Sequence, residues 1–182
     1  MEKLNLGCGN QRMKGFVNVD NNPNCNPDVF HDLNIFPYPF KKDTFDEIYL
    51  DHVLEHLDDP IKVLEEIFRI AKNKAKITIR SPHFSCGWLH PGHRSAISLY
   101  LFNYFDQFSQ ERYGNVCFSI NRIKLYWMRS RRDALEKRSI LVKGINKIIN
   151  FFANIYPGFT QRIWCYWVGG FEEIVFEATV IK

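Results

Sequence analysis

Short apolar runs separated by polar turns fill the first half of the chain. Five runs have the length of strands and end in loops rich in Asn, Pro or Gly: 3–6, 16–19, 28–31, 45–50 and 75–81. A sixth segment has helical spacing, with Asp59 as N-cap, Pro60 at the first helical position and a basic end at Lys72 and Lys74. Its predicted apolar face is Ile61, Leu64, Ile67, Phe68 and Ala71.

The strand predicted at 75–81 alternates more cleanly than a central parallel strand usually does. Ile77 and Ile79 alternate with Lys76, Thr78 and Arg80. This pattern predicts a sheet with one face only partly covered.

The pattern changes after residue 82. Residues 83–94 hold three histidines, two glycines, a proline and a tryptophan, which predicts a loop. An aromatic helix is expected over 95–108, a strand over 116–128, a basic helix over 129–152 and a closing strand over 171–181. In that last strand Ile174, Phe176, Ala178 and Val180 share one side.

This order of elements predicts an α/β chain with a mostly parallel sheet flanked by helices. At 182 residues the chain fits one domain, 1–182.

The first twenty residues predict a nucleotide-binding corner. The strand 3–6 runs directly into Gly7-Cys8-Gly9, and Asp20 closes the next strand. Glycines let the backbone pass close to a ligand where a β-carbon would collide. The carboxylate at the end of the second strand can accept hydrogen bonds from both hydroxyl groups of a ribose.

The composition and the sequence patterns limit the cell compartments and partners that we expect. No run of about eighteen apolar residues is present, so no membrane span is expected. The N-terminus lacks the pattern of a signal peptide, and the five cysteines are scattered, which favours a cytoplasmic protein without disulfides. Residues 1–60 hold 5 Lys/Arg against 11 Asp/Glu, whereas residues 61–182 hold 19 against 9. An acidic half suits a cationic ligand and a basic half an anionic partner.

Four short motifs follow one another along the first half of the chain. They are Leu-Asn-Leu-Gly-Cys-Gly, Asn-Val-Asp, His-Asp-Leu, and Phe-Asp-Glu-Ile-Tyr followed by His-Val-Leu-Glu-His-Leu. With these, residues 3–82 resemble the class I S-adenosylmethionine-dependent methyltransferases. The segments 82–85, 91–94 and 104–105 resemble an uncharacterised subgroup with a shortened first helix, some of whose members sit among glycan-assembly functions. Only ten residues separate Gly9 from Asp20, too few for a full first helix.

The resemblance implies a Rossmann-like fold with a helical, aromatic insertion on the substrate side. The domain would divide into a cofactor-binding half (1–82), a substrate-side half (83–170) and a closing strand (171–182).

The resemblance also implies S-adenosyl-L-methionine as cofactor and a set of residues that hold it. The backbone of Gly7, Cys8 and Gly9 would pass under the methionine and ribose parts of the cofactor. The carboxylate of Asp20 would accept hydrogen bonds from the ribose hydroxyls. The other implied cofactor-binding residues are Asn5, Asn21, Asp32, Leu33 and Asp51. Asn5 stands where the family usually has an acid, and Asn10 stands where a third glycine is common.

Three histidines are candidate general bases: His52, His83 and His93. Each lies at or just after the end of a predicted strand, on the side where such sheets bind ligands. Histidine suits proton transfer near neutral pH. The spacing Cys86-x3-His90-x2-His93 would also allow zinc, but histidines in a glycine-containing loop more often meet substrate or solvent, so no metal is expected.

The segment 110–150 carries ten Lys/Arg against three acids and then becomes apolar. Three interpretations stay open: a solvated helix packed on the domain, a peripheral membrane contact through 139–156, and a nucleic-acid surface.

The predicted function is a methyltransferase acting on an oxygen of a small-molecule or glycan-type acceptor. Leu50-Asp51-His52 occupies the place where many base-amino methyltransferases carry Asn/Asp-Pro-Pro-Tyr/Phe, which disfavours a base-amino acceptor. The alternatives are an RNA methyltransferase and a catalytically inactive module that binds a nucleotide and a membrane surface or partner.

Overall fold

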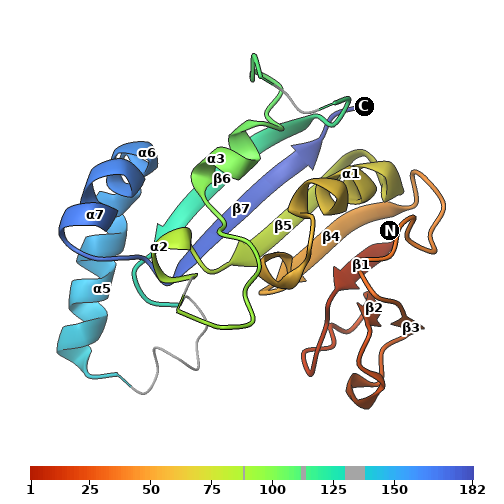
Figure 1. The fold of residues 1–182 in the computed structure, drawn as a ribbon, viewed down its shortest axis with the longest axis horizontal. Coiled ribbons are helices and arrows are strands. Elements are labelled where there is room, and N and C mark those ends of the chain that lie inside the picture. The colour runs from red at the N-terminus through yellow and green to blue at the C-terminus, as the bar shows by residue number, and fades with distance from the viewer. Residues whose placement is uncertain (88, 112–113, 130–137) are drawn as a thin grey trace.

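Seven strands form one sheet in the computed structural model, which describes residues 1–87, 89–111, 114–129 and 138–182 (Figure 1). The strands are β1 (Lys3–Leu6), β2 (Val17–Asp20), β3 (Val29–Phe30), β4 (Phe45–Asp51), β5 (Ala71–Ser81), β6 (Phe118–Tyr126) and β7 (Glu173–Val180). Their order across the sheet is β3-β2-β1-β4-β5-β7-β6. β1 to β5 run parallel, and β7 is antiparallel to both β5 and β6. This is the Rossmann-like, mostly parallel sheet that the sequence predicts.

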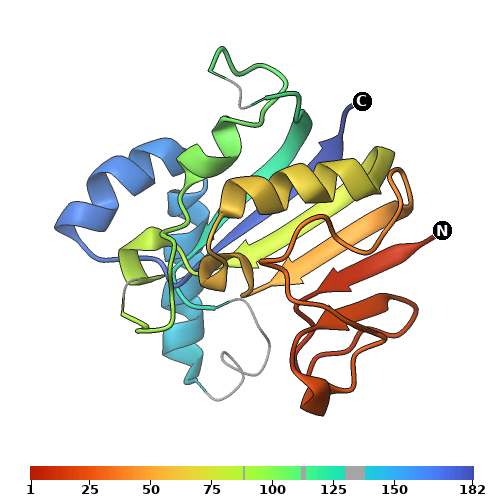
Figure 2. The ribbon, with the colours of Figure 1, turned by 45° about the vertical axis from the view of Figure 1, so that its right-hand side comes forward.

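The helical segments of the described residues comprise two long helices and several short ones. The main ones are α1 (Pro60–Ile70) and α5 (Ile140–Ala153). The short helical segments are η1 (Pro23–Cys25), η2 (Leu54–His56), α2 (Phe84–Gly87), α3 (Leu99–Asn103), α6 (Pro157–Phe159), the π-helical η3 (Thr160–Trp164) and α7 (Cys165–Trp167). α1 and α3 lie over one face of the sheet, and α5 to α7 lie on the side of β6, far from β1–β3 (Figure 2).

The strand order reverses between β1 and β4, and this reversal places the site. The chain runs outward from β1 to β2 and β3, then returns to β4 on the other side of β1. Loops that leave the carboxyl ends of β1 and β4 therefore diverge and open a crevice between them, as in other doubly wound sheets. Gly7 follows β1 and His52 follows β4, so both stand at this crevice.

Helix α1 begins as its sequence predicts. The Asp59 side chain accepts hydrogen bonds from the amides of Ile61 and Lys62, at 3.1 Å each, and Pro60 takes the first helical position. The fully buried face is Val63, Leu64, Ile67 and Ile70. The observed buried face differs slightly from the predicted one. Ile61 and Phe68 are only partly buried, and Ala71 already belongs to β5.

The two faces of the sheet differ in polarity. Ile77, Ile79, Phe176 and Ala178 are buried on the face that carries α1 and α3. On the opposite face the cross-strand neighbours Thr78 and Glu177, among others, are only partly buried. The prediction of a partly covered face at 75–81 is confirmed.

Several boundaries differ from the prediction. β5 starts at Ala71 because the chain passes from helix to strand without a loop, four residues earlier than expected. The aromatic helix expected over 95–108 is reduced to Leu99–Asn103, and the loop expected over 83–94 includes α2. The basic helix expected over 129–152 starts at Ile140, and its segment 130–137 lies outside the described residues.

Candidate active site

Two cavities open at the crevice between β1 and β4. The first, of about 520 Å³, is lined by Asn5, Gly7, Cys8, Gly9, Asn10, Gln11, Arg12, Met13, Tyr49, Asp51 and His52. The second, of about 410 Å³, is lined by Gly7, Asp20, Asn21, His31, Asp32, Leu33, Asn34, His52, Val53, His56, Leu57 and Arg94. The two cavities share Gly7 and His52, so they form neighbouring lobes of one groove.

All nine residues predicted to bind the cofactor lie on the walls of this groove. Asn5, Gly7, Cys8, Gly9 and Asp51 line the first cavity. Asp20, Asn21, Asp32 and Leu33 line the second. That these side chains contact a cofactor stays a prediction.

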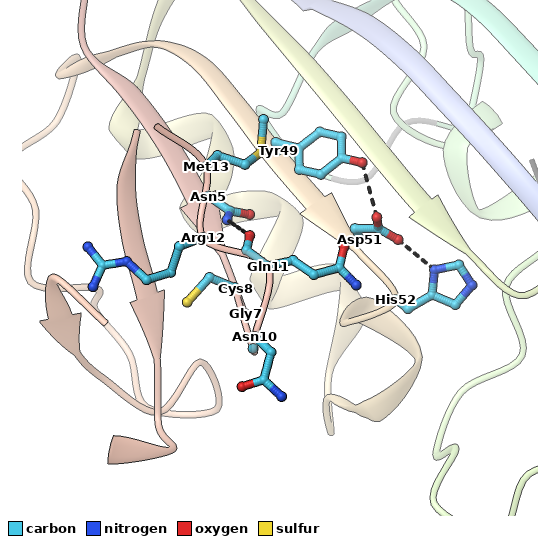
Figure 3. A pocket seen from close by; sticks show the side chains of 11 residues that line it. Asn5, Gly7, Cys8, Asn10, Gln11, Arg12, Met13, Tyr49, Asp51 and His52 are labelled. Carbon is cyan, nitrogen blue, oxygen red and sulfur yellow. Dashed lines mark hydrogen bonds and ion pairs between the residues drawn. The ribbon is translucent and has the colours of Figure 1, made fainter. Parts of the chain in front are cut away.

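Asn5 supports the loop that forms the first cavity (Figure 3). Its amide nitrogen donates to the carbonyl oxygen of Gln11 at 3.1 Å and to Oδ1 of Asn18 at 2.9 Å. Asn18 in turn donates to the carbonyl oxygens of Met13 and Phe16, which fixes its amide orientation. A carboxylate at position 5 has no hydrogen to donate, so the departure from the family's acid has a structural reason.

The two glycines of the first turn have different roles. Gly7 has φ +64°, and a β-carbon there would lie 2.4 Å from Cγ2 of Val53, so this glycine lets the turn pass η2. Gly9 has φ +48°, and a β-carbon there would have no atom within 4 Å. The space above Gly9 is therefore open to the first cavity and available to a ligand.

Carboxylates that line the groove have hydrogen-bond acceptor positions that the described part of the chain does not use. Asp20 accepts hydrogen bonds from the amides of Gly9 at 2.7 Å and Asn22 at 2.9 Å, and Asp32 accepts from the amide of Asn34 at 2.9 Å. An ionised carboxylate offers about four acceptor positions, so each retains sites for a ligand. Burial and the nearby charge of Asp20 raise the pKa of the Cys8 thiol, which keeps that group neutral.

His52 stands where the two cavities meet, paired with Asp51 (Figure 3). Its Nδ1 lies 2.7 Å from Oδ1 of Asp51, and the hydroxyl of Tyr49 donates to Oδ2 of Asp51 at 3.1 Å. Since a carboxylate only accepts, Nδ1 carries the hydrogen of this bond. Nε2 is buried and has no hydrogen-bond partner among the residues that the structure describes. A buried nitrogen without a partner is costly, so a group able to bond to it would stabilise the site.

The backbone of His52 is also unusual. Its φ is +58°, in the left-handed region that residues other than glycine rarely adopt. Conformations of this kind cost about 1–3 kcal/mol and cluster at functional sites.

An ion pair that the sequence analysis missed lies beside His52. Oε1 of Glu173 is 4.0 Å from Nε2 of His52, and Oε2 of Glu173 accepts from Arg80 at 3.0 Å. Glu173 is fully buried at the start of β7. The available signals were the polar position of Arg80 in an alternating strand and an acid beginning an otherwise apolar strand.

His83, a predicted base, does not line either cavity. It is fully buried, with Nδ1 2.7 Å from Oγ of Ser85 and Nε2 3.2 Å from Oε1 of Gln161. Gln161 also accepts from the amide of Leu99 at 2.8 Å. Burial lowers the pKa of His83 from its usual 6.5 to about 4. With both ring nitrogens engaged away from the groove, His83 is better explained as a link between β5 and the segment η3.

The burial of His83 predicts a loss of stability in acid. The unfolded chain protonates this histidine near pH 6.5 but the folded chain only near 4, so the unfolded state binds more protons within that window. Lowering the pH from 6.5 to 4 should therefore remove about 3 kcal/mol of the free energy of unfolding through this group. Urea unfolding at several pH values measures the effect. The variant His83→Asn should show a flatter dependence than the control His90→Asn, and equal slopes in both variants would contradict this explanation.

His93, the third predicted base, also stands outside the two cavities. Its Nδ1 lies 2.6 Å from the carbonyl oxygen of Gly87, and its ring packs against that of His56 with centroids 4.8 Å apart. The structure thus brings only His52, of the three candidates, to the groove.

Comparisons with known proteins agree with the fold. Residues 10–79 match the family described as a methyltransferase domain. No curated protein sequence matches the chain. An S-adenosylmethionine-dependent methyltransferase from Archaeoglobus fulgidus is 16% identical with a TM-score of 0.59, over 98% of this chain and 85% of that one. One from Mesorhizobium loti is 12% identical with a TM-score of 0.60, over 98% and 90%.

A third solved structure contains the cofactor. Phosphoethanolamine N-methyltransferase 2 of Haemonchus contortus, in complex with S-adenosyl-L-methionine, is 15% identical with a TM-score of 0.52. The match covers 100% of this chain and 49% of that one. At these identities the likeness to solved structures is one of fold.

Proposed function

We propose that this chain is a class I S-adenosylmethionine-dependent methyltransferase and that it methylates an oxygen of a small-molecule or glycan-type acceptor. The observation that carries the acceptor chemistry is the Asp51–His52 pair at the junction of the two cavities. An oxygen nucleophile has to lose a proton as it attacks, and a histidine held by a carboxylate is suited to take it.

The groove fits the cofactor. The open space above Gly9 and the acceptor positions left on Asp20 and Asp32 match a ligand with a ribose and an adenine amino group. S-Adenosylmethionine supplies a methyl group activated by a sulfonium cation, which suits an acidic groove. In this proposal Gly7, Gly9 and Asp51 border the methionine and ribose, while Asp20, Asn21, Asp32 and Leu33 hold the adenosine.

His52 would act as the general base. Asp51 holds the hydrogen on Nδ1, which leaves the lone pair of Nε2 to accept the acceptor's proton. Nε2 of His52 is buried in this structure and lies 4.0 Å from Oε1 of Glu173, so it does not face the cavities. Productive binding therefore requires the His52 ring to turn toward the cavities, and hydrogen bonds of this kind often tighten only in the substrate complex.

Labelled methyl transfer tests the acceptor chemistry. The chain is incubated with S-adenosylmethionine carrying a radioactive methyl group and with separate small-molecule, glycan-lipid and RNA fractions. The proposal expects label in one of the first two, either as an alkali-stable ether or as an alkali-labile ester. Label confined to RNA, or methylation only on nitrogen, would contradict it.

We also propose that the enzyme works at an anionic membrane surface. The helices α5 to α7 and the residues beside them carry many exposed large apolar side chains, here together called the apolar surface: Ile140, Leu141, Ile145, Ile148, Phe151, Phe152, Ile155, Tyr156, Phe159, Ile163, Tyr166, Trp167 and Val168. Exposed apolar patches of this extent mark interaction sites. No helix among the described residues is long and apolar enough to cross a bilayer.

The charge on this surface favours a membrane as its partner. Between residues 139 and 171 the sequence has Lys143, Lys147 and Arg162 and no acidic residue. Aromatic and aliphatic side chains beside cations are typical of helices that lie in the headgroup region of anionic bilayers. A glycan-type acceptor attached to lipid would be presented at such a surface.

Vesicle binding tests the membrane contact. The double variant Phe151→Ser/Phe152→Ser should reduce the fraction bound to phosphatidylserine-containing vesicles at least tenfold, since each buried phenylalanine contributes about 1.5–3 kcal/mol. Phe108→Ser is the matched control, because Phe108 is also exposed, at 84% against 66% for Phe151 and 61% for Phe152, but lies outside this surface. Equal binding by both variants would contradict the proposal, as would a stable dimer that covers the same residues.

A further inference from the structure

We infer that Glu55, His56 and His93 form a binding site for one divalent transition-metal ion. Glu55 and His56 lie in η2, and His93 lies in the loop that follows α2. One ligand atom from each side chain lies within 4.8 Å of the other two. Atoms that share an ion at about 2.0–2.2 Å stand about 3–4 Å apart, so small rotations of the two rings close the site.

The buried carboxylate of Glu55 is the first observation that points to a cation. The side chain is buried, with an exposed fraction of 1%. Its Oε2 accepts a hydrogen bond from Oγ of Ser81 at 2.9 Å, whereas Oε1 is buried and has no hydrogen-bond partner in the described part of the chain. An unsatisfied oxygen of a buried carboxylate is unfavourable, and a cation bound to Oε1 would remove that cost.

The two histidines are oriented as metal ligands usually are. Nδ1 of His56 lies 2.9 Å from the carbonyl oxygen of Gly92, and Nδ1 of His93 lies 2.6 Å from that of Gly87. Because a carbonyl only accepts, both rings donate from Nδ1 and keep Nε2 for a metal. A hydrogen bond from the other ring nitrogen to a carbonyl is the common way in which proteins fix the tautomer of a ligating histidine.

Two imidazoles and one carboxylate favour a particular class of ion. Nitrogen ligands suit zinc and its neighbours, while magnesium and calcium prefer sites built of oxygen. Three protein ligands also leave coordination positions open. His56 lines the second cavity, so the ion would stand at the rim of the groove. There an open position could hold an acceptor oxygen, a role that rests on the proposed function.

A second group, Asp51, His52 and Glu173, also has ligand atoms within 4.8 Å of one another. We do not infer a metal site there, because the Arg80 guanidinium lies 3.0 Å from Oε2 of Glu173. Its positive charge opposes a bound cation.

Metal titration tests the site without cofactor or acceptor, so its result does not depend on the proposed function. The full chain is titrated with Zn²⁺ by calorimetry and with Co²⁺ by absorbance. We expect one ion per chain with a Kd of about micromolar or below. Glu55→Gln, which keeps an acceptor for Ser81, should weaken binding at least tenfold, as should His93→Asn on the surface loop.

His90→Asn is the matched control. Nδ1 of His90 accepts from the amide of Gly92, so this ring is not presented in the same way, and its loss should change the affinity less than threefold. Zn²⁺ should also raise the unfolding temperature of the unaltered chain but not that of Glu55→Gln. Three results would overturn the inference: no binding, equal binding by all variants, or a Co²⁺ spectrum with the charge-transfer bands of cysteine ligation.

Discussion

Replacing His52 by asparagine is expected to lower kcat between about 100-fold and 10,000-fold, the usual contribution of a general base. Asparagine tolerates the left-handed backbone at this position better than alanine does, so the change removes the base with little effect on the turn. Binding of S-adenosylmethionine should stay within about threefold, because the backbone of the groove is kept.

The rate is measured as transfer of a labelled methyl group to the acceptor fraction that the unaltered chain methylates. His90→Asn, a histidine outside both cavities, should leave kcat within about twofold. Should His52→Asn retain nearly full activity over the range pH 6–9, the base is elsewhere or the acceptor attacks without one.

Replacing Asp20 by alanine is expected to weaken cofactor binding at least 100-fold. Hydrogen bonds to a charged group contribute about 1.5–3 kcal/mol each, and two ribose hydroxyls would use the two acceptor positions left on this carboxylate. Since about 1.4 kcal/mol corresponds to tenfold in affinity, losing both exceeds a factor of 100.

Two further variants separate this effect from a general disturbance. Asp46→Ala removes an acid that also holds a backbone amide, that of Glu2, but at the opposite end of β4, and it should bind the cofactor normally. Asp20→Asn retains one oxygen for the Gly9 amide and should give an intermediate affinity. Normal affinity in Asp20→Ala would remove this residue from the proposed ribose site.

The first half of the fold could be predicted because its signals are local. The strands β1 to β4 are short apolar runs closed by turn residues, and Asp59-Pro60 is a complete helix start within two residues. The order of strands then places Gly7, Asp20 and His52 at one crevice, so the groove followed from topology.

The second half could not be predicted in the same way, because its residues are defined by distant partners. His83 looks like a free histidine in a loop, but it is bonded to Gln161, 78 residues away. Glu173 becomes part of the site only when β7 returns beside β5 and meets Arg80, 93 residues earlier. Nothing near Glu55 in the sequence shows that one of its oxygens is buried without a partner.

Calorimetric titration of the unaltered chain with S-adenosylmethionine and S-adenosylhomocysteine tests whether the groove binds the cofactor. We expect both ligands to bind one to one with a Kd of about micromolar, and to compete for the same site. If neither ligand gives heat or raises the unfolding temperature at about millimolar concentration, the groove between β1 and β4 serves another ligand, and the proposed methyl transfer fails with it.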